Sequence, residues 1–165
     1  WTMLSEGVDA PAFRLPGTED ASEDFREYSL DGVLAAGPVL LNFYLFDFNP
    51  QCTGHLCTLH DAGWFEFDER LTVFGISTDR TFSHSAFAEQ EGLQFPLLSD
   101  SDGTVAEQYG VLYDDFQGHK RIAKRAVFLV DTDSVVQHAW STEDPTDQPD
   151  WQAVRDAVDA LEAPA

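Results

Sequence analysis

The chain has 165 residues, of which 43% are hydrophobic and thirteen are Phe. This length and composition exclude an intrinsically disordered protein and predict a single domain that spans residues 1–165. Thirty acidic residues against nine Lys and Arg give a formal net charge of -21. Because such a surface repels nucleic acid and anionic lipid, we expect neither as a partner.

The acidic residues are spread along the whole chain, and they also indicate the solvent in which the protein works. Repulsion between like charges destabilises a compact state, and dissolved salt screens that repulsion. We therefore interpret the chain as a protein from the salt-rich cytoplasm of an extreme halophile, the alternative being an ordinary acidic protein. The sequence lacks an apolar run of ~18 residues and a basic segment followed by an apolar one at its start, so we expect a soluble cytoplasmic protein.

The first half of the chain predicts an irregular segment followed by strands and a helix. Residues 1–37 are rich in Gly, Pro, Ser and acids and predict loops with a hairpin. The apolar run "PVLLNFYLF" at 38–46 predicts a strand buried on both faces. Apolar residues at helical spacing predict a helix from Pro50 to about Arg70, and "LTVFGIST" at 71–78 predicts a second buried strand.

The next part of the chain continues this alternation. Helices are predicted at 82–92 and 103–111, closed by Gly92 and Gly110, with a brief strand at 95–100 between them.

The last part of the chain predicts two strands and a helix. The strands lie within 125–140 and are joined by the turn at 131–133, which gives the sheet an antiparallel edge. The helix lies at 149–163, and its apolar residues form one stripe. These are Trp151, Val154, Val158 and Leu161. The whole pattern predicts an α/β fold with a central mixed β-sheet, mostly parallel, flanked by helices on both faces.

Both cysteines lie in "FDFNPQCTGHLCTLHD", residues 46–61. Asn49 is a good N-cap residue and Pro50 is favoured at the first helical position, so Cys52 becomes the third residue of a helix. There its sulfur lies among unpaired N–H groups at the positive end of the helix dipole, which favours a thiolate. A thiolate attacks peroxides and disulfides. The alternative is a buried, inert cysteine beside the strand.

The position of Cys57 favours the reactive interpretation. On an ideal helix the Cα atoms of Cys52 and Cys57 stand ~8.6 Å apart, whereas a disulfide tolerates little beyond ~7 Å. The two cysteines bond only if the first turns of the helix unwind. This suits a sulfenic acid that a second thiol must resolve, and it suits a structural disulfide poorly.

A metal site is the third interpretation of this stretch. Cys52, His55, Cys57 and His60 are all of possible ligand type. They point near ~0°, ~300°, ~140° and ~80° around an ideal helix and do not converge on one ion. We therefore predict no metal and expect His55 and His60 to be exposed helix residues.

The stretch "FNPQCTGHLCTLHD" resembles the active site of the peroxiredoxins, in particular peroxiredoxin Q, also called bacterioferritin comigratory protein. The nucleophile of that subgroup lies in a T-P-x-C-T motif, and its resolving cysteine often follows five residues later. Further segments agree in order and spacing and extend the resemblance from residue 7 to about 140. They are "VDAPAF", "VFGISTD", "FSHSAFAEQ", "LQFPLLSD", "VAEQYGV" and "KRAVFLVD".

The resemblance implies a thioredoxin-like fold and reduction of hydrogen peroxide or organic hydroperoxides. It implies that Cys52 is the peroxidatic cysteine, that Cys57 resolves it, and that Arg125 accompanies the thiolate. A thioredoxin-like protein then reduces the disulfide, no bound cofactor is needed, and the enzyme is a monomer or homodimer. The other cations of "KRIAKR" are expected to be neutral to activity or to face a partner. They are Lys120, Arg121 and Lys124.

Two positions depart from the family pattern. Leu45 stands where the family has a proline that shields the nucleophile, and Asn49 stands where it has a threonine. Asn49 caps the helix and offers an amide N–H, but it does not donate and accept through one atom as a hydroxyl does. The alternative function is therefore a redox sensor or thiol-disulfide exchange protein with the same fold and without efficient peroxidase activity.

Overall fold

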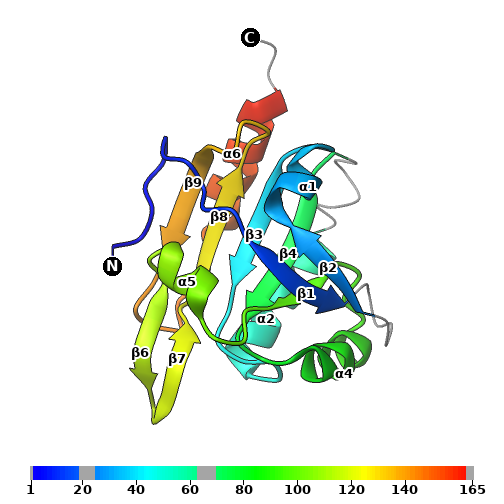
Figure 1. The fold of residues 1–165 in the computed structure, drawn as a ribbon, viewed down its shortest axis with the longest axis vertical. Coiled ribbons are helices and arrows are strands. Elements are labelled where there is room, and N and C mark those ends of the chain that lie inside the picture. Colours follow the sequence, from blue (N-terminus) through cyan, green and yellow to red (C-terminus); the bar gives the residue numbers. More distant parts are fainter. Residues whose placement is uncertain (1, 19–24, 63–69, 163–165) are drawn as a thin grey trace.

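A computed structural model of the protein describes residues 2–18, 25–62 and 70–162. Its centre is a seven-stranded sheet with the strand order β2-β1-β5-β4-β3-β8-β9 (Figure 1). The strands of this sheet are β1 (Arg14–Thr18), β2 (Phe25–Ser29), β3 (Val39–Phe43), β4 (Thr72–Ser77), β5 (Leu97–Ser99), β8 (Ala126–Val130) and β9 (Val136–Ser141).

The sheet is mixed, as predicted, but it is not mostly parallel. Only β3 with β4 and β4 with β5 pair in parallel. The hairpin of β1 and β2 joins the edge of β5 antiparallel, and β8 returns antiparallel to β3 and continues into β9. The prediction of a mostly parallel sheet was wrong because the strands at both ends of the chain add to the βαβ centre without a crossover helix.

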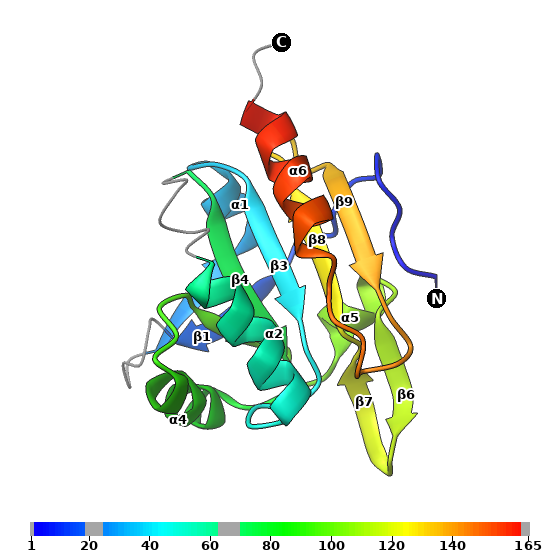
Figure 2. The same ribbon diagram turned by 180° about the vertical axis from the view of Figure 1, so that it is seen from behind.

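Helices cover both faces of the sheet. Their bounds are α1 (Leu30–Leu34), α2 (Pro50–Asp61), α4 (Thr81–Glu91), α5 (Thr104–Gln108) and α6 (Trp151–Glu162). Figure 1 shows α1 and α5 in front of the sheet, and Figure 2 shows α2, α4 and α6 on the opposite face. The fold is thus the predicted thioredoxin-like α/β arrangement.

Each face of the sheet has its own apolar cluster. Phe43, Tyr109 and Phe128 stack with one another on the side of α1 and α5. Leu56 of α2 and Val154 of α6 belong to the other cluster, together with Cys52. The strand β3 lies between the clusters with all five of its residues buried, which confirms the prediction of a strand buried on both faces, although β3 ends at Phe43 and not at residue 46.

Most of the predicted helices are confirmed within the described residues. α4 ends at Gly92, whose φ of 67° is left-handed, and Gly110 follows α5 with a φ of 73°. α2 ends at Asp61, shorter than predicted, while the remainder of the predicted helix, at 63–69, lies outside the described residues. On α6 the predicted stripe packs against the α2 side of the core.

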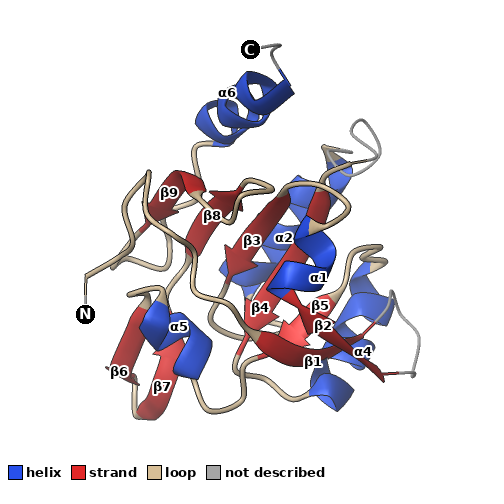
Figure 3. Cartoon of the chain, turned by 45° about the horizontal axis from the view of Figure 1, so that its top comes forward, coloured by secondary structure: helices blue, strands red, loops and turns tan. Residues whose placement is uncertain are grey.

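Two elements were not predicted. The short helix α1 begins at Ser29, whose hydroxyl accepts a hydrogen bond from the N–H of Gly32. The strands β6 (Leu112–Phe116) and β7 (His119–Ala123) form a separate hairpin, which lies beside α5 in Figure 3. Gln117 and Gly118 form its turn with φ values of 52° and 89°, as two-residue hairpins require. Among the described helices, none is long and apolar enough to cross a membrane.

Candidate active site

The first turn of α2 is built as the sequence predicts. Asn49 is the N-cap, Pro50 is the first helical residue, and Cys52 follows in the third position. The side-chain oxygen of Asn49 accepts hydrogen bonds from the N–H groups of Gln51 at 3.0 Å and Cys52 at 3.1 Å. These N–H groups were expected to be unpaired around the sulfur. They are paired with the side-chain oxygen of Asn49 instead. The cation that contacts the sulfur comes from another element.

That cation is Arg125. Its Nη2 donates a hydrogen bond to Sγ of Cys52 at 3.3 Å, and both residues are fully buried. The two residues meet because β3 and β8 are antiparallel neighbours, with Phe43 opposite Ala126. This register places the start of β8 beside the end of β3, from which the chain continues into α2.

His55 orients Arg125 and is not the exposed helix residue that the sequence analysis expected. It is fully buried, and its Nδ1 accepts a hydrogen bond from Nη1 of Arg125 at 3.0 Å. Because a guanidinium only donates, the proton of the ring is on Nε2, which donates to the side-chain oxygen of Asn42 at 3.1 Å. The amide of Asn42 donates in turn to the carbonyl of Phe74 on β4. Burial, with a smaller effect of the Arg125 charge, holds the pKa of His55 well below its ordinary value.

Both missed residues carried a signal in the sequence. His55 follows Cys52 by three residues, a spacing that places two side chains on one face of a helix. Asn42 interrupts a buried apolar strand, and a buried amide requires a partner. Their common partner is set by the register of β3 and β8, which the sequence alone does not reveal.

One of the three groups that accept hydrogen bonds from Arg125 is able to carry a negative charge. Its Nε and Nη2 also donate to the carbonyl of Pro145, at 3.2 and 3.1 Å. Its three acceptors are therefore this carbonyl, the neutral ring of His55 and the sulfur of Cys52. Burying an uncompensated guanidinium is costly, and of the three acceptors only the sulfur ionises to an anion.

Cys57 lies on the same continuous helix but in a different environment. It is a free, partly exposed thiol, and it donates a hydrogen bond to the carboxylate of Glu91 at 3.6 Å. Burial first, and then the charge and hydrogen bond of Glu91, raise the pKa of Cys57 to about 11. Since α2 is intact from Pro50 to Asp61, a disulfide with Cys52 requires the helix to unwind, as the ideal-helix distance of ~8.6 Å implies.

A buried polar cluster fastens the loop that leads into α2. Asp47 accepts hydrogen bonds from the hydroxyls of Tyr44 at 2.7 Å and Ser83 at 2.8 Å. Its carboxylate is also hydrogen-bonded to Nδ1 of His84 at 2.9 Å. The N–H of Asp47 donates to the carboxylate of Asp79 at 2.8 Å. The loop between β3 and α2 is thereby tied to α4 and to the end of β4.

The same loop contains a strained residue and a buried leucine. Phe48, between the anchored Asp47 and the N-cap, has a left-handed φ of 68°, which is uncommon outside Gly and Asn. Leu45 is buried in the same apolar cluster as Cys52.

Asp47, Asp79 and His84 also bring ligand-type atoms within 4.8 Å of one another. These atoms already have protein partners. Nε2 of His84 donates to the carbonyl of Leu98 at 3.0 Å, and Asp79 accepts from the hydroxyl of Ser77 at 2.7 Å. We therefore interpret the cluster as a set of hydrogen bonds that holds the loop before α2 in place, and not as a metal centre.

The other cations of "KRIAKR" have acidic partners on the surface. Lys120 pairs with Asp115, Arg121 with Glu107, and Lys124 with Glu143. Among the described residues, none of these three pairs includes Cys52, Cys57 or His55, in contrast to the contacts of Arg125.

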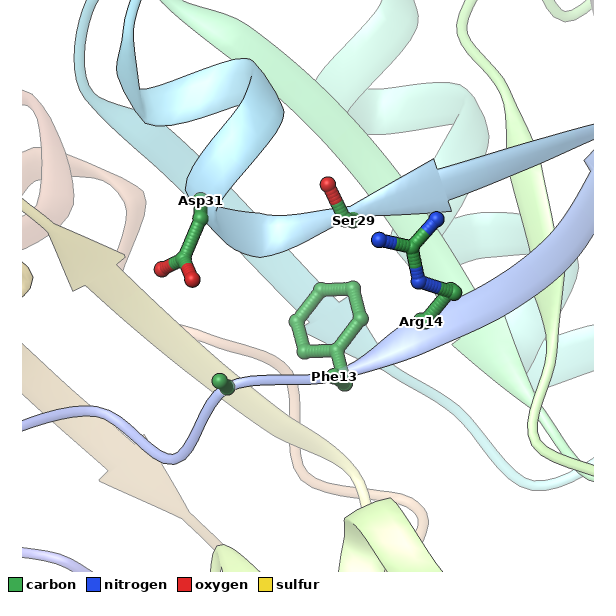
Figure 4. Close-up of a pocket in the computed structure, with 5 residues that line it drawn as sticks. Phe13, Arg14, Ser29 and Asp31 are labelled. Carbon is green, nitrogen blue, oxygen red and sulfur yellow. The ribbon is translucent and has the colours of Figure 1, made fainter.

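Two hollows lie on opposite faces of the sheet. One adjoins α2 and is lined by Pro50, Gln51, Gly54, Thr58, Gln148 and Trp151. There the side-chain amide of Gln148 donates to the carbonyl of Gln51, so the loop before α6 rests on the first turn of α2. The other lies beside α1, where the Phe13 ring is flanked by Arg14 and Asp31 (Figure 4).

Comparison with known proteins identifies the family of the chain. The model of the AhpC/TSA family matches residues 7–139. The chain is 36% identical over 140 residues to a putative peroxiredoxin bcp of Coxiella burnetii, covering 83% of this chain and 88% of that protein. It is 34% identical over 147 residues to the peroxiredoxin Bcp of Escherichia coli, covering 83% and 85%.

Solved structures extend the match to the fold. The crystal structure of peroxidoxin BcpB from Mycobacterium tuberculosis superposes with a TM-score of 0.76 at 32% identity, covering 97% of this chain and 98% of the other. The reduced 2-Cys peroxiredoxin of Plasmodium vivax gives a TM-score of 0.82 at 25% identity, covering 95% and 81%. The chain accordingly belongs to the AhpC/TSA family, the peroxiredoxins, and is a thiol-dependent peroxidase with two cysteines.

Proposed function

We propose that Cys52 attacks the peroxide, that Arg125 and Asn49 assist it, and that Cys57 resolves the product, as in the peroxiredoxin Q subgroup. The observation that carries this proposal is the buried guanidinium of Arg125 in contact with Sγ of Cys52. A fixed cation at this distance stabilises a thiolate, which is the nucleophilic form of cysteine.

In the first step the Cys52 thiolate attacks one oxygen of the O–O bond of hydrogen peroxide or an organic hydroperoxide. The S–O bond forms as the O–O bond breaks, and the second oxygen takes a proton and leaves as water or an alcohol. Arg125 stabilises the negative charge that develops on the leaving oxygen. Cys52 is left as a sulfenic acid.

In the second step the first turns of α2 unwind and the sulfur of Cys57 attacks the sulfenic acid. The S–S bond forms, the S–O bond breaks, and the proton of the Cys57 thiol leaves with the hydroxyl group as water. A dithiol protein of the thioredoxin type then reduces the disulfide by exchange. The cycle uses the side chains of this chain and an outside reductant, without a bound cofactor or metal.

Replacing each cysteine tests these roles. Cys52→Ser should reduce peroxide consumption to the uncatalysed rate, because a hydroxyl does not replace the thiolate. Cys57→Ser should consume one equivalent of peroxide and then stop with thioredoxin as reductant, and a 1,3-diketone reagent should trap the sulfenic acid. Stopped-flow fluorescence and mass spectrometry in molar KCl measure both outcomes.

Full peroxide consumption by Cys52→Ser would refute the assignment. Oxidation of Cys52 by disulfides but not by peroxides would instead support the redox sensor or thiol-exchange protein.

Asn49 is expected to cap α2 but to support a slower reaction with peroxide than a threonine at the same position. Its oxygen is occupied by two N–H groups, so its amide N–H is left to contact the peroxide. Asn49→Thr keeps a side chain that caps helices and restores a hydroxyl that donates and accepts. We expect the second-order rate constant with peroxide to rise up to about tenfold, the value of one hydrogen bond of ~1.4 kcal/mol.

Stopped-flow oxidation with hydrogen peroxide and with an organic hydroperoxide checks this expectation. Asn49→Asp is the matched control, since it keeps the cap but adds a negative charge near the thiolate and should react more slowly. An Asn49→Thr rate at or below that of the natural protein would contradict the argument.

His55 acts as a positioning residue only while it is neutral. Its folded-state pKa is depressed, whereas in the unfolded chain it takes up a proton near its ordinary pKa of ~6.5. The unfolded state therefore binds more protons below that pH, and the free energy of unfolding falls as the pH decreases. Lowering the pH from about 7 to about 5.5 should decrease the free energy of unfolding by about 1 kcal/mol through His55 alone.

Urea denaturation across this range tests the effect. His55→Gln keeps an acceptor for Arg125 but does not titrate, so its stability should fall less with acid than that of the natural protein. Equal slopes for His55→Gln and the natural protein would show that His55 is protonated in the fold.

We further propose that the protein works in the salt-rich cytoplasm of a halophile. The support is the net charge of -21, which remains after the nine Lys and Arg are counted against the thirty acidic residues. Salt shortens the Debye length from ~10 Å at 0.1 M to ~3 Å at 1 M and weakens repulsion between the remaining carboxylates.

The free energy of unfolding should therefore rise as KCl is increased from about 0.1 M to 2 M. Urea denaturation at each salt concentration measures it, and an uncharged osmolyte at equal osmolality is the control. A stability that stays flat or decreases with KCl, or that rises equally with the osmolyte, would refute the adaptation to salt.

A further inference from the structure

Glu91 is the last residue of α4, and its carboxylate contacts the thiol of Cys57 across the gap between α4 and α2. The Sγ–Oε2 distance is 3.6 Å, and Cys57 donates the hydrogen bond. The other oxygen of Glu91 accepts from the side-chain amide of Gln90 at 3.1 Å. The carboxylate is therefore held at both oxygens and directed at the sulfur.

A carboxylate is an unsuitable neighbour for a thiol whose task is nucleophilic attack. Attack requires the thiolate, and a negative charge in contact opposes its formation. Burial first, and then the charge and hydrogen bond of Glu91, raise the pKa of Cys57 to about 11, so the thiol is the favoured form near neutral pH. The proton accordingly stays on sulfur, and the contact stabilises the thiol.

The contact also bears on the conformation of α2. A hydrogen bond to a charged group is stronger than a neutral one, and this one joins the middle of α2 to the end of α4. It exists only while Cys57 is at its place on the folded helix. Unwinding of α2 breaks it and exposes the sulfur to solvent, where burial and Glu91 no longer act on it.

We propose that Glu91 keeps Cys57 as an unreactive, hydrogen-bonded thiol while α2 is folded and releases it when the helix unwinds, so that resolution waits for unwinding. The proposal rests on the assignment of Cys57 as the resolving cysteine. It makes Glu91 a positioning residue that delays the second step: the Cys52 sulfenic acid persists as long as the folded helix does. The bond changes in that step are unchanged, and Glu91 alters only when the thiol becomes available.

The first experiment measures Cys57 by itself. In Cys52→Ser the chain has a single cysteine, so alkylation by iodoacetamide reports on Cys57 alone. Adding Glu91→Gln should accelerate alkylation at about pH 8 and lower the midpoint of its pH profile. The rise from the ordinary 9.0 to about 11 corresponds to about 100-fold less thiolate, which is the upper limit of the acceleration, and a several-fold gain is expected because burial remains.

Variants of two other carboxylates distinguish the effect of direct contact with Cys57 from the effect of a nearby negative charge. Glu89→Gln removes one exposed charge from the same helix and should leave the alkylation rate unchanged. Among the described residues, Asp61 is the other carboxylate that raises the pKa of Cys57, and it acts more weakly. Asp61→Asn should give a small acceleration that fades in molar KCl, whereas the effect of Glu91→Gln should persist because direct contact is poorly screened.

The second experiment measures resolution with Cys52 present. After one equivalent of hydrogen peroxide, rapid quenching and mass spectrometry give the rate of disulfide formation. The disulfide should form faster in Glu91→Gln than in the natural protein or Glu89→Gln, and less Cys52 should be overoxidised at excess peroxide. Circular dichroism verifies that each variant is folded, and Glu91→Asp, which keeps the charge but shortens the side chain, should be intermediate.

The outcomes distinguish the two claims. Equal alkylation rates and equal disulfide rates in Glu91→Gln and Glu89→Gln would overturn the role of Glu91 and leave the assignment of Cys57 intact. Slower resolution in Glu91→Gln would also overturn it, because Glu91 would then act as a base. Failure of every variant to form the disulfide would refute Cys57 as the resolving cysteine, and with it the link from Glu91 to resolution.

Discussion

The site depends on one buried cation. The Arg125 guanidinium is fully removed from solvent, and the surrounding chain is arranged to make that tolerable. The Pro145 carbonyl, the neutral ring of His55 and the sulfur of Cys52 accept its hydrogen bonds. Because a buried charge without a partner is strongly destabilising, the contact that we propose activates Cys52 also contributes to the stability of the fold.

Fixing that cation requires elements from distant parts of the chain. His55 comes from α2, Asn42 from β3 and the Phe74 carbonyl from β4, and they form one line of hydrogen bonds that ends in the sheet. In this line Arg125 donates to His55, His55 donates to Asn42, and Asn42 donates to the Phe74 carbonyl. A change of tautomer at His55 would leave Arg125 facing an N–H group, so the line determines the direction as well as the position of the guanidinium.

The sequence predicted those features of the site that depend on residues close together in the chain. The N-cap of Asn49, the start of α2 and the pairing of Cys52 with a cation all follow from short-range patterns or from the family resemblance. His55 was wrongly expected to be exposed, because whether one face of a helix is buried depends on what lies over it. Asn42 was not predicted as a site residue, and the antiparallel pairing of β3 with β8 was not predicted either. Both depend on contacts between residues far apart in the chain.

The same limit applies to the loop before α2. "FDFNP" has an aspartate and two aromatic residues, and the sequence alone made no prediction for the conformation of Asp47 or Phe48. In the structure Asp47 is buried against His84 of α4, and this anchoring holds Phe48 in a left-handed conformation. No local rule predicts a positive φ at a phenylalanine, so the strain becomes understandable only once the tertiary contact is known.

The two cysteines share a helix but are held by opposite charges. Arg125 favours the anion at Cys52, while Glu91 favours the neutral thiol at Cys57. Both contacts also stabilise α2 in its folded form, since each joins the helix to a different element. Oxidation of Cys52 changes this balance, because a sulfenic acid is neutral and no longer compensates the guanidinium. In the proposed cycle the loss of that charge would weaken the attachment of the first turn of α2, so the proposed first step would favour the unwinding that the proposed second step requires.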